Sequence, residues 1–307
     1  MPCRKCKGEE ATKPYCSKCV ALFVSTIKNK GPALQAAAID FARRGEQSYL
    51  DGNVVYSDQA KGADANHGSA FGFRASSKVF TLLTPGTASI SIEKFISPIG
   101  STRTVCECKT FMLAVYYNAI RTVLEDLHPQ LFDLVFDKLT LTPDPGDDVR
   151  LKGFFTIKSI AFSQEFLVRA GDWLYVANPS VTYSEVNIQV TGGKGQSGAA
   201  GGWNLVCVST VPNKYLGLGL TDLSATAPKE QSLSAILDYM YQEGKTKEVV
   251  TKDEWGVKPR ARSGSLDLKD EKTDQKRLVH LTEQKKRPRL YQLSASLLAE
   301  TVADSLR

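Results

Sequence analysis

Cys108 is the side chain whose type and position point most directly to chemistry. It lies in Val-Cys-Glu-Cys-Lys-Thr-Phe-Met (105–112), where an extended run from Ile92 to Val105 gives way to an apolar helical pattern. This placement predicts a thiol on the first turn of a helix, where the partial positive charge of the helix end favours the thiolate. A thiolate attacks acyl carbons, so the position suggests a nucleophile. The alternative is a small buried side chain, the commoner role of a cysteine.

A second group of cysteines stands near the N-terminus, as Cys3-x2-Cys6 and Cys16-x2-Cys19. Two such pairs can place four thiolates around one tetrahedral ion, and soft sulfur ligands at this spacing suit zinc. The lysines and the arginine that surround both pairs offset the thiolate charge. We therefore predict a structural zinc module over residues 1–22. The alternative is two unrelated cysteine pairs.

Composition sets the broad class of the chain. Of its 307 residues, 42% are hydrophobic and 23% are charged, as in soluble globular proteins. No apolar run is long enough to predict a membrane span, and the first residues lack the apolar core of a secretory signal. We therefore expect a cytoplasmic protein without a membrane partner. In that reducing compartment the seven cysteines are read as metal ligands or free thiols rather than as disulfides.

Positive charge gathers in the last part of the chain. Residues 244–307 carry most of the formal net charge of +6, and their densest basic piece is Lys285-Lys286-Arg287-Pro288-Arg289. Such a cluster can bind an acidic partner or the phosphate backbone of a nucleic acid. Acidic residues are interleaved with the basic ones, which favours a solvated, partly disordered tail. We expect the end of the tail, Tyr291 to Leu306, to form an amphipathic helix.

Hydrophobic periodicity predicts the elements that must position Cys108. Helical spacing appears in the ranges 21–42 (interrupted at Gly31-Pro32), 107–127, 129–138 and 232–241. Alternating or continuous apolar patterns predict strands in the ranges 78–105, 154–162, 173–177, 186–190, 204–209 and 214–220. The Gly-rich stretch 192–202 lacks the ending of a phosphate-binding loop, so we interpret it as a hairpin loop.

A helix that carries a cysteine at its start and precedes an antiparallel sheet is the order of elements in papain-like thiol enzymes, including NlpC-type peptidases. Within that superfamily the chain most resembles the spore-coat-type bacterial transglutaminases, over roughly residues 70–240. Three segments carry the resemblance in the same order: Cys106-Glu107-Cys108-Lys109-Thr110 leading to Tyr116-Tyr117, Gly171-Asp172-Trp173-Leu174-Tyr175-Val176-Ala177-Asn178-Pro179, and Lys214-Tyr215 with Gly217-Leu218-Gly219-Leu220.

The resemblance implies acyl transfer, with Cys108 as nucleophile and Glu107 as the acidic residue before it. The thiolate would attack a glutamine side-chain amide, ammonia would leave, and an amine or water would take the acyl group. In this register Trp203 occupies the position of the family's base, and tryptophan cannot accept the proton. Three alternatives stay open: Glu185 is the base, Glu107 is the base, or the chain has no base. Against Glu107 stands the effect of a neighbouring carboxylate, which raises the pKa of a thiol.

The residues expected to line the substrate cleft are Trp203, Asn204, Tyr175 and Tyr215. Together the patterns predict an α+β chain with three parts: the zinc module (1–22), a papain-like, transglutaminase-like domain (23–243) and the basic tail (244–307). The predicted function is a thiol acyltransferase whose partners are a glutamine-bearing protein and an amine donor, with zinc as the structural cofactor. The alternative is an inactive papain-like relative that binds an acidic partner or nucleic acid through the zinc module and the tail.

Overall fold

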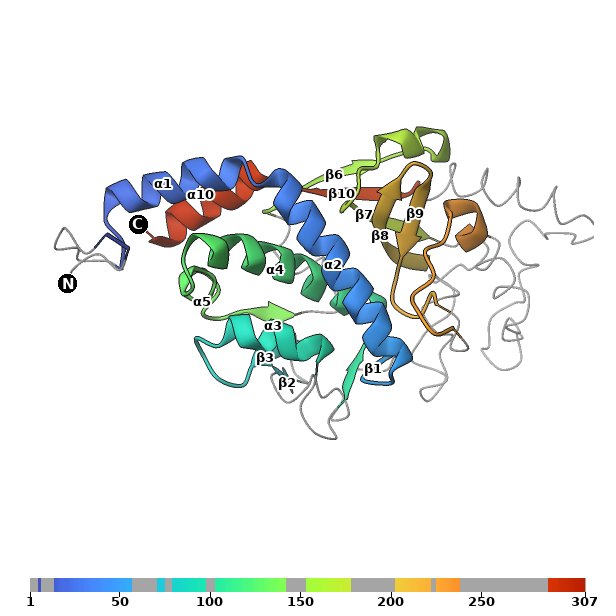
Figure 1. The fold of residues 1–307 in the computed structure, drawn as a ribbon, viewed down its shortest axis with the longest axis horizontal. Helices are drawn as coiled ribbons and strands as arrows, with labels where there is room; N and C mark the ends of the chain where they lie inside the picture. The colour runs from blue at the N-terminus through green and yellow to red at the C-terminus, as the bar shows by residue number, and fades with distance from the viewer. Residues whose placement is uncertain are drawn as a thin grey trace, which may run out of the picture.

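Two twenty-residue helices, α2 (Gly31–Leu50) and α4 (Cys108–Leu127), form the centre of the fold. A computed structural model describes residues 5–6, 14–56, 71–74, 79–97, 103–141, 153–177, 202–221, 225–237 and 287–306. The middle of α4 is buried on all sides, as expected of a helix that is apolar all round. α2 crosses it closely (Figure 1), because Gly45 leaves room where a Cβ atom would come within 2.4 Å of the Phe111 ring.

One end of α4 meets an antiparallel sheet of five strands. These are β6 (Phe155–Ser159), β7 (Trp173–Ala177), β8 (Gly202–Thr210), β9 (Asn213–Leu216) and β10 (Arg289–Leu293). Their order in the sheet is β6-β10-β7-β8-β9. Most of β8 is buried on both faces. Because successive side chains of a strand point to opposite faces, each residue of β8 belongs either to the helix side or to the far side of the sheet.

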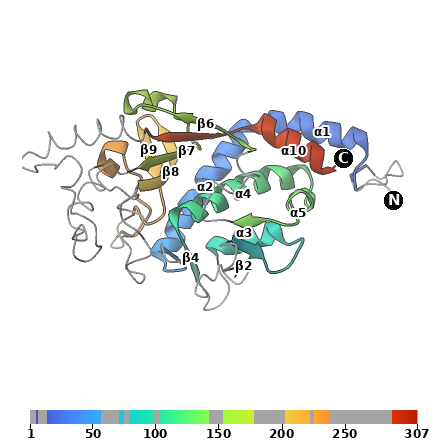
Figure 2. The same ribbon diagram turned by 180° about the vertical axis from the view of Figure 1, so that it is seen from behind.

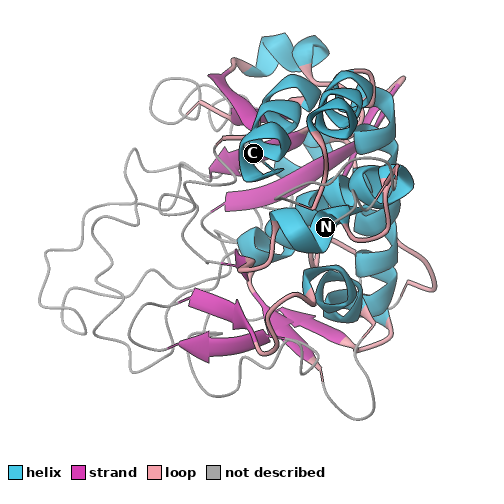
Figure 3. Ribbon diagram, turned by 90° about the vertical axis from the view of Figure 1, so that its left-hand side faces the viewer, coloured by secondary structure: helices cyan, strands magenta, loops and turns pink. Residues whose placement is uncertain are grey.

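Smaller elements add to the mixture of helices and sheets, which agrees with the α+β part of the predicted fold class (Figures 1 and 3). Helices α3 (Ala88–Ile96) and α5 (Leu131–Val135) pack on α4. The described part of the fold also contains two small sheets and a short 3-10 helix: parallel β1 (Val54–Tyr56) and β4 (Thr104–Cys106); antiparallel β2 (Phe71–Arg74), β3 (Val79–Leu82) and β5 (Thr140–Leu141); and η1 (Phe162–Leu167).

The helix-strand order before Cys108 differs from the sequence prediction. Residues 78–105 were expected to be extended, but α3 occupies 88–96, and the strands among the described residues of this range are β3 and β4. The alternation Ser89-Ile90-Ser91-Ile92 imitates a strand over four residues. Over the whole segment, the buried side chains follow helical spacing instead (Ala88, Ser91, Ile92, Phe95 and Ile96).

The end of the predicted tail belongs to the body of the protein. β10 lies between β6 and β7, and helix α10 (Ala295–Leu306) packs along α1 (Ser17–Lys28), as Figures 1 and 2 show. The predicted boundary at residues 22/23 falls inside α1. Residues 17–28 and 289–306 therefore pack in the body of the protein rather than forming separate parts. The amphipathic C-terminal helix is confirmed from residue 295, whereas Tyr291 lies in the strand before it.

Other predicted elements fall partly outside the described residues. These include the strand at 186–190, the Gly-rich loop up to residue 201 and the first two residues of the basic cluster, Lys285 and Lys286. Arg287 and Arg289 are described, and both are exposed. Within the described residues, no helix combines the length and the apolar character that crossing a membrane requires.

Candidate functional site

Cys108 is the first residue of α4, which confirms the predicted helix start. β4 ends at Cys106, and Glu107 between the two elements has the extended backbone of an N-cap residue. The chain therefore turns sharply from a strand into the central helix. The side chain of Cys108 is partly exposed, whereas that of Cys106 is fully buried.

Asn204, on β8, faces the Cys108 thiol from the sheet. Its Nδ2–H donates a hydrogen bond to Cys108 Sγ at 3.1 Å. The other end of the same amide accepts a hydrogen bond of 2.9 Å from Trp173 Nε1. Indole nitrogen is a donor only, so Asn204 Oδ1 must point toward Trp173 and the amide nitrogen toward sulfur. The indole donor of Trp173 thus fixes the orientation of this buried amide.

Trp173 is held by two further aromatic rings. It stacks on Tyr116 of α4 with ring centres 5.8 Å apart, and on Tyr291 of β10 with centres 4.5 Å apart. Such offset stacks restrict the rotation of the indole. The C-terminal strand therefore takes part in positioning Asn204, and through it the donor that reaches Cys108.

The thiol form of Cys108 is favoured, contrary to the expectation from the helix end alone. Burial, which disfavours the charged thiolate, raises the pKa of Cys108 to about 11. The Asn204 hydrogen bond acts in the opposite direction, and the neighbouring Glu107 carboxylate raises the pKa further. Because these environmental effects exceed that of the helix end, the protonated thiol predominates at neutral pH.

The predicted cleft residues divide between the two faces of the sheet. Tyr175 of β7 lies directly opposite Asn204 in the strand pairing, and therefore on the same face as the thiol. Burial raises the pKa of Tyr175, and the nearby Cys108 raises it further. Trp203 and Tyr215 belong to the core on the far side of the sheet. There Tyr215 donates a hydrogen bond of 2.8 Å to Glu165 Oε1.

The residue that faces Cys108 from the sheet is thus Asn204 and not Trp203. The sequence register placed Trp203 at the position of the base, but the alternation of side chains along β8 turns it to the other face. Asparagine, like tryptophan, has no group that titrates in the useful range. Of the two acidic candidates, Glu107 lies beside Cys108 at the helix start, and Glu185 lies outside the described residues.

Replacing Asn204 by leucine is expected to raise the pKa of Cys108, because the variant removes the amide donor and keeps a similar volume. A hydrogen bond to a charged group contributes about 1.5–3 kcal/mol, so alkylation of Cys108 at a fixed pH should slow by roughly tenfold or more. The measurement is the rate of iodoacetamide labelling at Cys108, located by fragmentation of the tryptic peptide 104–109, which also contains Cys106. Asn213→Leu, which changes an asparagine on β9, is the control. Equal rates in both variants would contradict a role for the amide.

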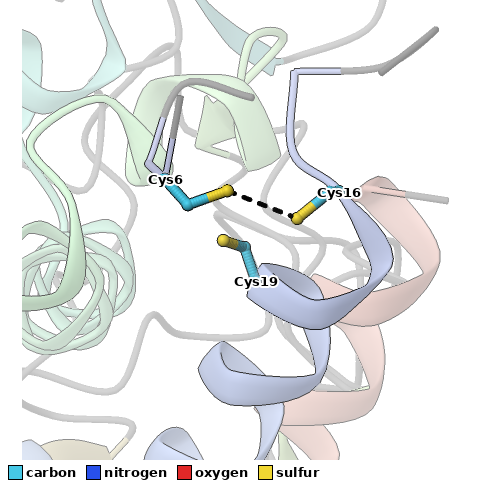
Figure 4. Close-up of side chains that lie close together, drawn as sticks. All are labelled: Cys6, Cys16 and Cys19. Atoms are coloured by element: carbon cyan, nitrogen blue, oxygen red, sulfur yellow. Dashed lines mark hydrogen bonds between the residues drawn. The ribbon is translucent and has the colours of Figure 1, made fainter. Parts of the chain in front are cut away.

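A second constellation lies at the start of α1 (Figure 4). Cys16 is the N-cap residue, Cys19 lies in the first turn, and Cys6 approaches from the preceding segment. Their three sulfur atoms lie within 4.8 Å of one another, close enough to hold a metal ion. Cys6 Sγ and Cys16 Sγ are 3.7 Å apart. Cys3, the fourth predicted ligand, lies outside the described residues.

This cysteine cluster is tied to the central helix by the residue between its two parts. Tyr15 is buried, and its hydroxyl lies 2.8 Å from Nδ1 of His128, the C-cap residue that follows α4. The Tyr15 ring also contacts Phe23 of α1 edge-on. The cluster therefore connects the N-terminal segment with the end of α4 opposite to Cys108.

Two residues at or near the site were missed by sequence reasoning. Trp173 was assigned only to a strand, and its link to Asn204 depends on a pairing with a distant strand that no local pattern reveals. Glu46 of α2 is fully buried. A signal for it existed, because Glu46 continues the four-residue spacing of Ala38 and Ala42 on the buried face of α2.

Comparison with known proteins identifies no relative: neither the family models nor the curated proteins contain a match to this chain.

Proposed function

We propose that the protein is a thiol acyltransferase of the transglutaminase type, built on a papain-like frame. The observation that supports it best is the chain of hydrogen bonds from Trp173 through Asn204 to Cys108. A thiol that served only for packing would need no oriented amide donor, whereas a thiolate or a developing oxyanion beside it does. Cys108 is partly exposed as a residue, unlike the fully buried Cys106 two positions before it.

The proposed reaction has two steps. Cys108 sulfur attacks the carbonyl carbon of a glutamine side chain, the C–N bond breaks, and the thiol proton leaves with ammonia. The thioester then reacts with an amine or with water, and the released sulfur regains a proton. Asn204 would stabilise negative charge on sulfur during both steps. Because the pKa of Cys108 is raised to about 11, only about one molecule in ten thousand carries a thiolate at pH 7.

The test is incorporation of a fluorescent primary amine into a glutamine-bearing protein. Wild type should show a rate that rises about tenfold per pH unit between roughly pH 6 and pH 8, because the thiolate fraction rises in that proportion. Cys108→Ala should reduce incorporation to background. Cys106→Ala, which removes the buried thiol two residues away, should retain it. Unchanged incorporation by Cys108→Ala would refute the proposal.

A second function, binding without catalysis, is favoured by one observation: the side chain that faces Cys108 from the sheet is an asparagine, which cannot take a proton. Installing a base is the discriminating experiment. If wild type shows no amine incorporation at any pH and Asn204→His gains it, the domain is an inactive relative. In that case the proposed function is the binding of an acidic partner near Arg287 and Arg289. The affinity for this partner should fall as the salt concentration is raised.

For the cysteine cluster we propose a structural zinc ion held by Cys6, Cys16, Cys19 and Cys3. A tetrahedral zinc with Zn–S bonds of about 2.3 Å separates its sulfur ligands by about 3.8 Å. The 3.7 Å between Cys6 and Cys16 sulfurs fits that geometry. The thiolates of Cys16 and Cys19 would also sit at the positive end of α1. Zinc would supply a cross-link and take no part in acyl transfer.

A further inference from the structure

Glu46 is a buried acid that the proposed reaction leaves unused. It lies on α2 and is fully inaccessible to solvent. Among the described residues, neither of its carboxyl oxygens has a hydrogen-bond partner of normal geometry. A buried ionised carboxylate without a cation is costly, so the neutral acid is the form that suits this environment.

The groups that face Glu46 belong to the segment 217–221, which follows β9. They are the backbone N–H groups of Gly219 and Thr221 and the hydroxyl of Thr221. The Thr221 oxygen already accepts a hydrogen bond from the N–H of Lys229 at 3.3 Å, so the hydroxyl proton is free to point toward Glu46. The titratable groups whose pKa responds to Glu46 are Tyr49 of the same helix and Cys106 of β4. Segment 217–221 itself contributes no titratable side chain.

The same segment forms a tight turn between α2 and the strand that carries Asn204. Leu220 N–H donates to Gly217 O at 2.8 Å, and Gly219 at the third position has a positive φ of 75°. A Cβ atom on Gly217 would lie 2.5 Å from the backbone oxygen of Asn204. It would also lie 2.9 Å from Cδ1 of Trp203. One side of the turn therefore touches α2, and the other touches β8 next to the partner of Cys108.

We propose that protonated Glu46 is a positioning residue: it keeps the turn 217–221 seated on α2, and the seated turn holds Asn204 in hydrogen-bond reach of Cys108. Ionisation of Glu46 places a charge in a site closed to water, and hydration of that charge requires the turn to move aside. Asn204 then loses the packing of Gly217 against its backbone, and the thiolate of Cys108 loses the hydrogen bond from the Asn204 amide. The consequence for acyl transfer rests on the proposed function, whereas the consequence for the turn and for Cys108 does not.

Burial raises the pKa of Glu46 to about 8, while the Thr221 hydroxyl and the two N–H groups lower it. The turn should therefore be displaced as pH rises through about 8. Tryptophan fluorescence, titrated from about pH 6 to about pH 9.5, should show a transition near that value in wild type. Glu46→Gln, which stays neutral, should show none. Thr221→Val, which removes a group that stabilises the ionised form, should move the midpoint to higher pH.

The second measurement is the rate of Cys108 alkylation, followed on the peptide 104–109. In Glu46→Gln the rate should rise about tenfold per pH unit across the range, and in wild type it should flatten above about pH 8. Wild-type and Glu46→Gln profiles that superimpose, by fluorescence and by alkylation, would overturn the inference. Profiles that diverge while amine incorporation is absent at every pH would refute the acyltransferase and retain the positioning role.

Discussion

Glu46→Gln is expected to flatten the dependence of stability on pH. In the folded chain the pKa of Glu46 is about 8, against an ordinary value of 4.5, because burial disfavours its charge. Between these two values the folded state binds the proton and the unfolded state releases it. The free energy of unfolding therefore falls as pH rises, by about 1.4 kcal/mol per unit, to a total on the order of 5 kcal/mol.

The measurement is denaturant unfolding of wild type and Glu46→Gln at a series of pH values. Near pH 5 both side chains are neutral and of similar size, so the two proteins should differ little. Toward pH 8 and above, the glutamine variant should become the more stable one, and the difference should stop growing above about pH 8. A difference that is the same at every pH would show that Glu46 does not titrate in the folded state as its burial requires.

Removing the proposed zinc ion is the second change with a large expected effect. A ligand that binds only the folded state stabilises it by about 4 kcal/mol when its free concentration is a thousand times its dissociation constant. For a chain of 307 residues the corresponding fall in the thermal midpoint is roughly 6 °C. The loss of stability should begin at α1 and at its contact with α10, because Cys16 and Cys19 lie at the beginning of α1.

Metal analysis of the purified chain should find one zinc ion per molecule, and a strong chelator should lower the thermal midpoint. Cys16→Ser and Cys19→Ser should lose both the zinc and the chelator effect. Cys207→Ala is the matched control, because Cys207 is a buried cysteine on β8 in the other core. A protein that carries no zinc and does not respond to the chelator would contradict a metal site, even though the three sulfurs lie close together.

The positions of Cys108 and of the cysteine pairs were accessible to sequence reasoning, because each depends on local features. A helix start follows from hydrophobic periodicity and from the residues before it, and α4 begins at the predicted cysteine. Cysteine pairs at short spacing indicate a shared ion, and three of the four sulfurs do lie together. Strand β7 matches its predicted range of 173–177 as well.

The partner of Cys108 could not be obtained in the same way. Trp203 and Asn204 are neighbours in the sequence, so an error of one residue in register exchanges the side chain that faces the thiol. The choice was made by the pairing of β8 with β7 and by the packing of α4 against one face of the sheet. The pKa of Cys108 likewise depends on burial by distant segments, which outweighs the local effect of the helix end.

Sequence patterns were enough to place Cys108 at a helix start and to group the N-terminal cysteines, since helix starts and cysteine spacings are properties of neighbouring residues. The surroundings of these cysteines follow from the tertiary structure. It placed Asn204 beside Cys108, brought Tyr291 from the end of the chain onto Trp173, and buried Glu46 under the turn 217–221. These contacts join residues that are far apart along the chain, and their geometry follows from the packing of whole elements rather than from any local pattern.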